Sequence, residues 1–490
     1  MAPAPHAGFS NIEFGFADAE KESAENPELL ISAFLDESHL VEKAIKGSPF
    51  LFLGYKGSGK TAIAERANLL QQHDPHLFVS VEQLKDFSYL EFKMTSGGAG
   101  DHQTRYPTTW GYLLLLSLLK SLERDEGGRQ RSPDEYRQVV AGLTALGLMP
   151  VPRLGELVKR STKASLKVGI PKFLEGLLET VRESPDLRMM QMVNVLEQAA
   201  DHFRTESRHV IFLDGLDAVV SQRDLQFQSL AALMREVDRL NNHFRKREQQ
   251  FKFVVLCRTD IFERLPGADT NKLRQDSGVE LDWYDDPRHP ERTRLVRLAN
   301  VRARASLHRK FDVFDEYLPP RVGHRAIRGH LLVHTRHTPR DLLQLLKRIQ
   351  ARAGTEERMT ATQVKSGIRD YSCNYFIGEV RNELAGYLEH GQIDNAITLL
   401  TSFSSPRITT QDLRTRVTEI GYGALDIEGM LTALFNCSAI GTIEETDGKD
   451  RYTFKYRNRT ASWVPGSVAW IHPGAWKGLN IEAADPAIGA

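Results

Sequence analysis

The apolar positions of this chain follow two alternating patterns, one typical of buried strands and the other typical of helices. Short continuous apolar runs predict strands covered on both faces, as in a parallel sheet, at 49–54, 77–81, 89–92, 209–214 and 253–260. Runs with an apolar residue every three or four positions predict helices at 26–46, 62–71, 108–122, 189–203 and 225–244. Strands that alternate with helices in this way predict an α/β domain.

The pattern after residue 286 is different, because the predicted helices are no longer separated by strands. They cover 290–310, 324–350, 381–400, 409–420 and 426–436, and a turn at 446–449 predicts a β-hairpin. Three helices followed by a hairpin is the order of a winged helix. We therefore predict a helical lead-in at 1–48, an α/β domain at 49–285 with a helical insertion at about 123–190, a helical lid at 286–375 and a winged-helix-like α+β domain at 376–490.

Length and composition agree with a multidomain protein without a membrane segment. The 490 residues exceed one typical core, and 64 basic and 64 acidic residues give a formal net charge of zero. The first residues do not form a secretory signal, and no apolar run reaches membrane-spanning length. The three cysteines are far apart in the sequence, which favours a reducing cytoplasm over a disulfide framework.

The sequence from Gly54 to Thr61 has the pattern G-x-x-x-x-G-K-[ST], between a predicted strand and a predicted helix. Its glycines allow the backbone N–H groups to turn toward phosphate oxygens, and the helix start adds the positive end of its dipole. We expect Lys60 to bind the β- and γ-phosphates and Thr61 to bind Mg²⁺. The alternative is an ordinary glycine turn. The residues expected to contact the nucleotide are Gly54, Tyr55, Lys56, Gly57, Ser58, Gly59, Lys60, Thr61 and Ala62.

Two aspartates follow another predicted buried strand. Asp214 ends the apolar run at 209–214, and ligands of open α/β sheets bind at the carboxyl ends of the strands. Asp214 is therefore the expected partner of the Mg²⁺ held by Thr61. Asp217 follows within one helical turn and either acts on the attacking water or caps the next helix.

Three arginines are candidates for contact with the γ-phosphate. Arg258 follows the strand at 253–260 and would emerge near Asp214, and Arg274 could act as an arginine finger on a neighbouring subunit. Arg340 lies at a predicted helix start, after Thr338 and Pro339, from which a closing lid could bring it to the phosphate. For all three, a purely surface role is the alternative.

Two predicted helices are candidates for nucleic-acid binding. The helix at 290–310 is rich in arginine but carries a buried apolar stripe, so we interpret its arginines as a solvated polar face. The third helix of the winged-helix-like domain, at 426–436, has no Lys or Arg, although the wing carries Lys449, Arg451, Lys455, Arg457 and Arg459. DNA contact is therefore possible but not favoured, and a protein contact is the better interpretation.

Taken in order, these motifs resemble those of STAND and AAA+ ATPases, which belong to the additional-strand (ASCE) class of P-loop NTPases. The Asp-Gly-Leu-Asp strand end at 214–217 is more similar to STAND proteins, and the chain also resembles uncharacterised bacterial P-loop ATPases of this size. The resemblance implies that Asp214 holds Mg²⁺ through water and that Asp217 acts on the attacking water. It also implies that Arg258 is a first sensor and Arg340 a second, lid-borne sensor.

These observations together predict a cytoplasmic, Mg²⁺-dependent ATPase that acts as a switch, with defence or signalling as the expected role and a protein partner or further copies of itself as the expected partner. The choice of ATP over GTP comes from the family resemblance alone. Two alternatives stay open: a DNA-binding AAA+-like initiator, and a scaffold that binds nucleotide without hydrolysing it. No membrane partner is expected.

Overall fold

The computed structural model divides the chain into two compact units. It describes residues 8–85, 87, 92, 102–145, 147–149, 154, 156–158, 185–216, 223–267, 270–285, 288–354, 356–421, 426–446 and 449–481. One unit comprises Met1–Leu35, Lys56–Gly59 and Asp282–Ala490, and is called the first unit here. The second unit comprises Asp36–Tyr55 and Lys60–Leu281. Most of the predicted strand at 89–92 lies outside the described residues.

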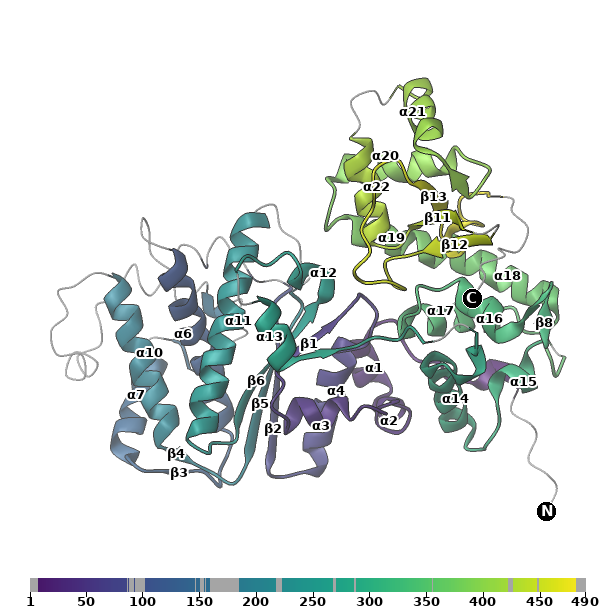
Figure 1. Cartoon of the computed structure of the whole chain (residues 1–490). Helices are drawn as coiled ribbons and strands as arrows, with labels where there is room; N and C mark the ends of the chain where they lie inside the picture. Colours follow the sequence, from purple (N-terminus) through teal and green to yellow (C-terminus); the bar gives the residue numbers. More distant parts are fainter. Residues whose placement is uncertain are drawn as a thin grey trace, which may run out of the picture. The chain divides into compact units, whose positions relative to one another are not determined.

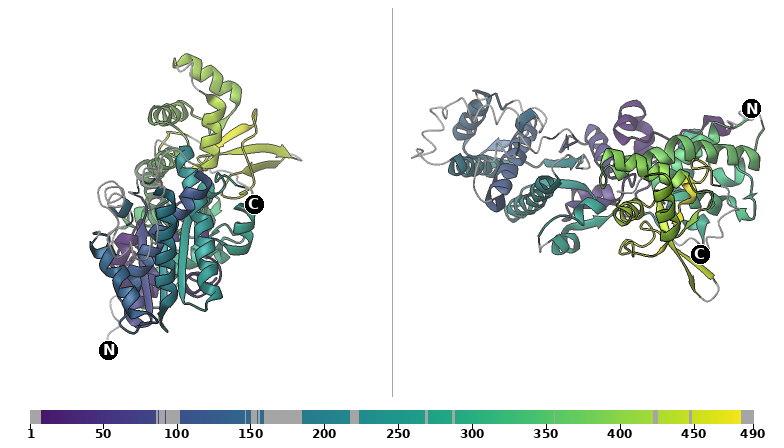
Figure 2. Two further views of the ribbon diagram at one scale, coloured as in Figure 1. Left: turned by 90° about the vertical axis from the view of Figure 1, so that its left-hand side faces the viewer. Right: turned by 90° about the horizontal axis from the view of Figure 1, so that it is seen from above.

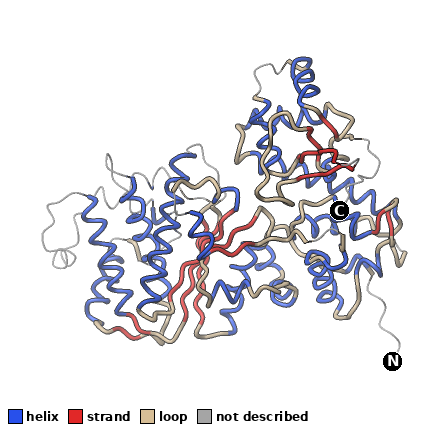
Figure 3. The backbone as a smooth tube through the Cα atoms, in the orientation of Figure 1, coloured by secondary structure: helices blue, strands red, loops and turns tan. Residues whose placement is uncertain are grey.

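A five-stranded sheet forms the centre of the second unit (Figure 3). Its strands, in spatial order, are β2 (Leu77–Gln83), β5 (Arg208–Asp214), β6 (Phe251–Arg258), β1 (Leu51–Gly54) and β7 (Gly278–Glu280). All neighbouring pairs are parallel. β6 thus lies between the strand that precedes the phosphate loop and the strand that ends at Asp214. This extra strand places the unit in the additional-strand P-loop class, and the predicted parallel α/β sheet is confirmed.

Helices cover both faces of this sheet. In Figure 1, α6, α10 and α11 lie on one side of the sheet, and α3 and α4 lie on the other. The side chains of α6, α10 and α11 bury, with the strands, a continuous apolar core that includes Trp110, whose indole nitrogen donates to the Ser229 carbonyl at 2.9 Å. The elements of this unit besides the sheet are α3 (Leu40–Ile45), α4 (Lys60–Leu70), α6 (His102–Leu122), β3 (Arg129–Gln130), α7 (Pro133–Ala145), α10 (Pro185–His202), β4 (Phe203–Arg204), α11 (Arg223–Lys246), α12 (Thr259–Phe262) and α13 (Thr270–Ser277).

The helix predicted at 26–46 is wrong as a single element. The chain forms α2 (Pro27–Ser32), leaves the helical conformation, and starts again with α3. The cause is local, since the Asp36 carboxylate accepts hydrogen bonds from the N–H groups of Leu40 and Val41 and so caps a new helix. His39, which precedes α3, has a left-handed φ of 52°.

The first unit is mostly helical and has its own apolar core. Its elements up to residue 371 are α1 (Ala19–Glu25), α2, α14 (Arg294–Leu307), α15 (Val313–Tyr317), β8 (Arg321–Val322), β9 (Arg325–Ala326), α16 (Ile327–Val333), α17 (Pro339–Gln350) and α18 (Ala361–Tyr371). α18 continues through a π-helical turn, Ser372–Phe376, into α19 (Ile377–Leu384). The predicted domain boundary at 376 falls inside this continuous helical segment.

The remainder of the first unit combines three helices with an antiparallel sheet. The helix predicted at 381–400 is two helices, because α19 ends at Leu384 and α20 (His390–Thr401) begins after the Glu389 capping box. α21 (Thr410–Glu419) and α22 (Ile427–Asn436) follow as predicted. The sheet has the order β10 (Arg407–Ile408), β13 (Val468–Ile471), β11 (Ile440–Thr446) and β12 (Lys449–Thr453). Figure 2 shows the β11–β12 hairpin extending beyond the other strands.

The arginine-rich helix α14 is not simply a solvated polar face, which corrects the sequence interpretation. Arg302 is buried, and its guanidinium donates to both carboxylate oxygens of Glu22 at 2.7 Å and to the Phe14 carbonyl at 3.1 Å. The segment before α1 is therefore fastened to α14. Among the described helices, none combines the length and apolar character needed to cross a bilayer.

Candidate functional site

The phosphate loop has the backbone conformation that its glycines predict. β1 ends at Gly54, and α4 begins at Lys60, so that Lys60, Thr61 and Ala62 form the first turn of an eleven-residue helix. Gly57 and Gly59 have φ angles of 80° and 96°, a region that residues with a Cβ atom rarely adopt. At Gly57 a Cβ would also lie 3.0 Å from Arg340 Cβ. Both the backbone conformation and this close approach therefore disfavour a side chain at this position.

Lys60, Thr61 and Asp214 converge in the second unit. The Lys60 ammonium is buried and donates to the carbonyls of Gly54 at 2.9 Å and Tyr55 at 3.1 Å. The Thr61 hydroxyl donates to Asp214 Oδ2 at 2.7 Å, across 153 positions of sequence. The other carboxylate oxygen, Oδ1, accepts from the Gly215 N–H at 2.7 Å, which fixes the orientation of the carboxylate. The start of α4 and the end of β5 thus bring together the hydroxyl and the carboxylate that the sequence predicted as partners.

The tip of the loop, Lys56–Gly59, makes its described contacts within the first unit. The Arg340 N–H donates to the Gly57 carbonyl at 3.3 Å, and the Trp283 indole donates to the Ser58 carbonyl at 2.8 Å. The Lys56 ammonium lies 3.2 Å from Glu379 Oε2, and Arg340 Nη1 lies 3.6 Å from the same oxygen. Arg340 is the second residue of α17, as predicted, and Glu379 lies in α19.

The donor set of the loop fits a nucleotide phosphate with Mg²⁺. A hard divalent cation prefers oxygen ligands, and Thr61 and Asp214 present a hydroxyl and a carboxylate in direct contact. The Ser58 hydroxyl is buried and has no hydrogen-bond partner among the described residues, which suits a ligand oxygen at the loop. The start of α4 supplies N–H groups and the positive end of a helix dipole to an anion.

The other predicted residues are placed less directly. Arg258 ends β6 opposite Gly54, but its guanidinium is buried and donates to both oxygens of Asp260, at 2.9 and 2.7 Å. Arg274, the candidate finger, pairs with Glu280 at 2.8 Å and with Glu263 at 3.5 Å in its own chain. Asp217 lies outside the described residues, so its role stays a prediction.

Sequence reasoning missed two residues near these sites. Gln83 ends β2 directly opposite Asp214 in the parallel register, and residues opposite each other on neighbouring strands share a face. Its position at the end of an apolar run was the available signal. Glu379 had no local signal, because it meets Lys56 and Arg340 only through the fold.

A buried charge network lies directly beside Arg340. Arg336 donates from its Nε to Asp341 at 3.0 Å and from Nη1 to Glu383 at 2.6 Å. The Tyr375 hydroxyl donates to the other oxygen of Asp341 at 3.0 Å. Burial alone would raise the pKa of Asp341, but the charge of Arg336 and its hydrogen bonds hold that pKa below its usual value. Because Glu383 and Tyr375 flank Glu379 along the α18–α19 segment, this network fixes the helix that carries Glu379.

A serine, a histidine and an aspartate also meet in the core of the second unit. His209 Nδ1 lies 2.8 Å from the Ser121 hydroxyl, and His209 Nε2 lies 3.3 Å from Asp125 Oδ2. Ser121 and His209 are both completely inaccessible to solvent, so this group cannot meet a substrate. Burial lowers the pKa of His209 to about 4, and the neutral ring serves as a hydrogen-bonded core residue.

Comparisons with known proteins give one partial family match and several distant structural likenesses. A family model described as the FunZ-associated C-terminal helical domain matches residues 293–376. No curated protein matches the chain.

The solved structures with a similar arrangement include Orc1 of Aeropyrum pernix in complex with DNA, at 14% identity and a TM-score of 0.36, covering 93% of this chain and 96% of that chain. Another is the RuvB Holliday junction branch migration motor of Thermotoga maritima, at 12% identity and a TM-score of 0.32. The match covers 93% of this chain and 100% of that chain. A third is Cdc6p of Pyrobaculum aerophilum, at 13% identity and a TM-score of 0.33, covering 95% of each chain. Because these TM-scores are below 0.5, the P-loop fold is assigned from the strand order and the phosphate loop.

Proposed function

We propose that this protein binds and hydrolyses ATP with Mg²⁺ and acts as a nucleotide-controlled switch. The observation that carries the proposal is the direct 2.7 Å hydrogen bond between Thr61 and Asp214, beside a glycine loop that leads into α4. A threonine hydroxyl and a strand-end aspartate are the residues that hold Mg²⁺ in P-loop enzymes. A glycine loop without this pairing would support phosphate binding alone.

Each residue of the site then has a definite task. Backbone N–H groups from Gly54 to Thr61 hold the phosphates, and the Lys60 ammonium leaves the carbonyls of Gly54 and Tyr55 to pair with the β- and γ-phosphates. Thr61 and Asp214 would hold Mg²⁺, and a cation bound there would supply positive charge beside the transferred phosphoryl group. Asp217 orients or deprotonates the attacking water. Gln83 lies opposite Asp214 at the same edge of the sheet.

The loop tip supports the switch part of the proposal. Lys56 and Arg340 share the single carboxylate oxygen Oε2 of Glu379. A γ-phosphate at the loop offers both cations a second anion, so their pairing changes between the nucleotide-bound and nucleotide-free states. A difference of this kind is what a ligand needs to shift a conformational equilibrium. Arg258, which Asp260 holds at the end of β6, is the proposed first sensor, and Arg340 is the second.

For the carboxyl-terminal domain we propose a winged-helix-like module that binds protein. α22 carries no Lys or Arg, and the carboxylate of Glu428 near its start accepts from the Trp463 indole at 3.0 Å. A helix of this charge would be repelled by a DNA backbone. The sequence resemblance to STAND proteins adds a proposed role in bacterial defence or signalling, with a protein partner or other copies of this chain.

The test is phosphate release from ATP by purified wild-type and Lys60→Ala protein. Removing one partner of a buried charged contact costs roughly 2–5 kcal/mol, so the variant should bind ATP about 30-fold or more weakly and release no phosphate. A control with the same change of charge outside the loop is Lys246→Ala, at the exposed end of α11, which should behave as wild type. Unchanged ATP affinity in Lys60→Ala protein would overturn the proposal.

A further inference from the structure

The second unit contains a recess at the opposite ends of its strands from the phosphate loop. β1 is short, and its first residue, Leu51, pairs with Val255, so the amino-terminal part of β6 extends beyond the start of β1. There the Asn241 side chain replaces the missing strand, since it donates to the Phe253 carbonyl at 2.9 Å and accepts from the Phe253 N–H at 2.8 Å. The recess is therefore a consequence of strand length and is framed by α11 and α13.

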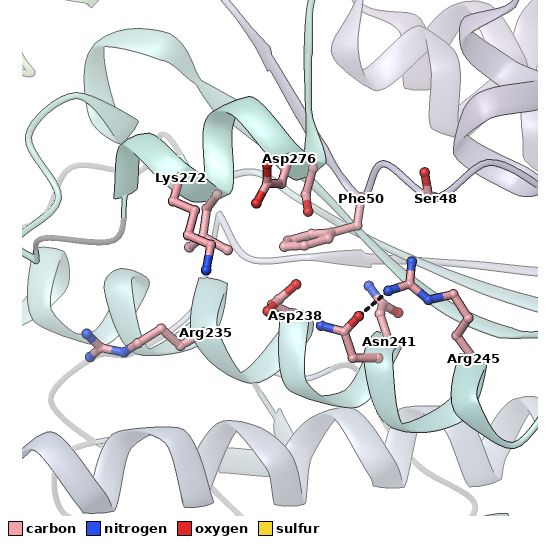
Figure 4. A pocket seen from close by; sticks show the side chains of 11 residues that line it. Ser48, Phe50, Arg235, Asp238, Asn241, Arg245, Lys272 and Asp276 are labelled. Carbon is pink, nitrogen blue, oxygen red and sulfur yellow. Dashed lines mark hydrogen bonds between the residues drawn. The ribbon is translucent and has the colours of Figure 1, made fainter.

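Two adjoining cavities occupy this recess. Their volumes are about 470 and 340 Å³, and both are lined by Ser48, Asn241 and Arg245. Figure 4 shows Lys272 and Asp276 of α13 facing Asp238 of α11, with Arg245 farther along α11. Cavities of some 300–1,000 Å³ are typical of sites for small ligands.

The smaller cavity is cationic. It is lined by Lys46, Arg208, Arg245 and Lys252, against one acid, Glu248. In the described part of the chain, neither Arg208 nor Lys252 forms an ion pair. Lys252 donates to the carbonyls of Lys43 at 2.8 Å and Gly47 at 2.7 Å, and Arg208 reaches the Ile45 carbonyl at 3.5 Å.

The proximity of these two cations has an energetic cost. Burial and, secondly, the charge of Arg208 lower the pKa of Lys252 to about 7, and burial also lowers the pKa of Arg208. Helix-end carbonyls compensate only part of two like charges. An anion bound between them would stabilise both, and a phosphate group provides the charge and the several acceptor oxygens that match them.

The larger cavity has a different character, because it presents both charges and neutral polar groups. Arg235 and Lys272 lie there with Asp238, Asp276 and Asn242, and within the described ranges none of these four charged side chains is in an ion pair. Such a lining can donate and accept hydrogen bonds to a polar ligand. Its two acids, with Glu248 in the smaller cavity, would repel an extended polyanion such as nucleic acid.

We propose that the joined cavities bind a small phosphorylated ligand of nucleotide size. The phosphate lies on Arg208, Arg245 and Lys252 in the smaller cavity. The polar head of the ligand lies on Asp238, Asn242 and Asp276 in the larger one. This site is built from the beginnings of β1, β5 and β6, whereas Gly54 and Asp214 lie at the ends of β1 and β5. It is therefore separate from the phosphate loop and does not depend on the function proposed for that loop.

The test is equilibrium dialysis of full-length Lys60→Ala protein with labelled AMP and, separately, with labelled inorganic phosphate. In this background the phosphate loop is expected to bind phosphate groups about 30-fold or more weakly. We expect saturable binding of at least one probe at one site per chain. The double variant Arg208→Ala/Arg245→Ala should weaken it about tenfold or more, because charge-assisted hydrogen bonds to phosphate are lost.

Two controls make the outcome decisive. Lys246 is next to Arg245 in the sequence but lines neither cavity. The substitution Lys246→Ala therefore removes a nearby positive charge and should leave binding unchanged. Arg245→Gln alone, at an exposed position, should weaken binding even if the double variant proves unstable. The proposal would be overturned by any one of three results. These are no saturable binding of either probe, equal binding by proteins with the original and the altered cavity, and displacement of AMP by a short oligonucleotide at a concentration lower than that of unlabelled AMP.

Discussion

The two units differ in where their important polar contacts come from. In the second unit, Thr61 lies in the first turn of α4, after the loop that follows β1, and Asp214 ends β5, and a short local pattern identifies each of them. In the first unit, Asp341 meets Arg336, which is near in sequence, but also Tyr375 on another helix, and Glu379 meets Lys56 across the chain. Polar groups at a strand end or in a loop with a sequence motif can thus be predicted from sequence, whereas polar contacts assembled by helix packing cannot.

The units also differ in their buried histidines. Burial lowers the pKa values of His334 and His337 in the first unit to about 3, and that of His472 lies well below its ordinary value for the same main reason. His337 is sandwiched in an aromatic group, with its ring stacked on Tyr456 at 5.3 Å. In the described part of the second unit, His209 alone shows a comparable shift, to about 4.

The largest expected effect is therefore a selective loss of stability of the first unit in acid. The unfolded chain binds protons at these histidines below about pH 6.5, whereas the folded unit does not, so stability falls as the pH decreases from that value toward 4. Each of the three buried histidines contributes roughly 2 kcal/mol to this loss by about pH 5. Urea unfolding at pH 7 and pH 5, followed by hydrogen exchange of peptides from each unit, measures it.

Peptides from α16 and α17 should lose more protection than peptides from β5 and β6. Equal losses in both units would contradict the comparison, since the second unit has the smaller number of buried neutral histidines. Replacement of the exposed His289 by Gln provides a control, and it should leave the pH dependence of both units unchanged.

A second effect concerns the charge network of the first unit. Asp341→Asn leaves the guanidinium of Arg336 with one fewer buried anion, and breaking a buried pair in this way costs about 3–5 kcal/mol. Unfolding followed by tryptophan fluorescence in a Trp110→Phe background reports the first unit, because the other four tryptophans, Trp283, Trp463, Trp470 and Trp476, belong to it.

The matched control is Asp394→Asn, which removes a carboxylate that pairs with Arg381 at the surface of the same unit. It should change the unfolding midpoint little, because exposed pairs are screened by solvent. If the two substitutions had the same effect, the buried network would have no special part in the stability of this unit.

The smallest effect is expected at the loop tip. Glu379→Gln removes the negative charge shared by Lys56 and Arg340, so both become available to a phosphate. Because partly exposed pairs are worth roughly 0.2–1 kcal/mol, ATP affinity should rise by a factor of about 1.4 to 5. Calorimetric titration with ATP measures this change in affinity for wild-type and Glu379→Gln protein. Glu419→Gln, which alters an exposed ion pair, is the control. A loss of affinity would instead mean that Glu379 positions these cations for binding.

Particular residues show how far the sequence could be interpreted. The parallel sheet, the phosphate loop and the start of α17 at Pro339 were predictable, because each depends on neighbours in the chain. The division of α2 from α3 by Asp36 and the burial of Arg302 against Glu22 were not, since they depend on side-chain contacts that periodicity does not encode. The role of Asp217 and the domain boundaries stay predictions.

The most direct test of the account is the Mg²⁺ dependence of ATP affinity, measured by calorimetry in wild-type, Thr61→Val and Asp214→Asn protein. We expect Mg²⁺ to strengthen ATP binding to the wild type and this gain to disappear in both variants, while metal-free binding through Lys60 persists. A full Mg²⁺-dependent gain in Asp214→Asn protein would contradict the assignment of Thr61 and Asp214 as the metal site.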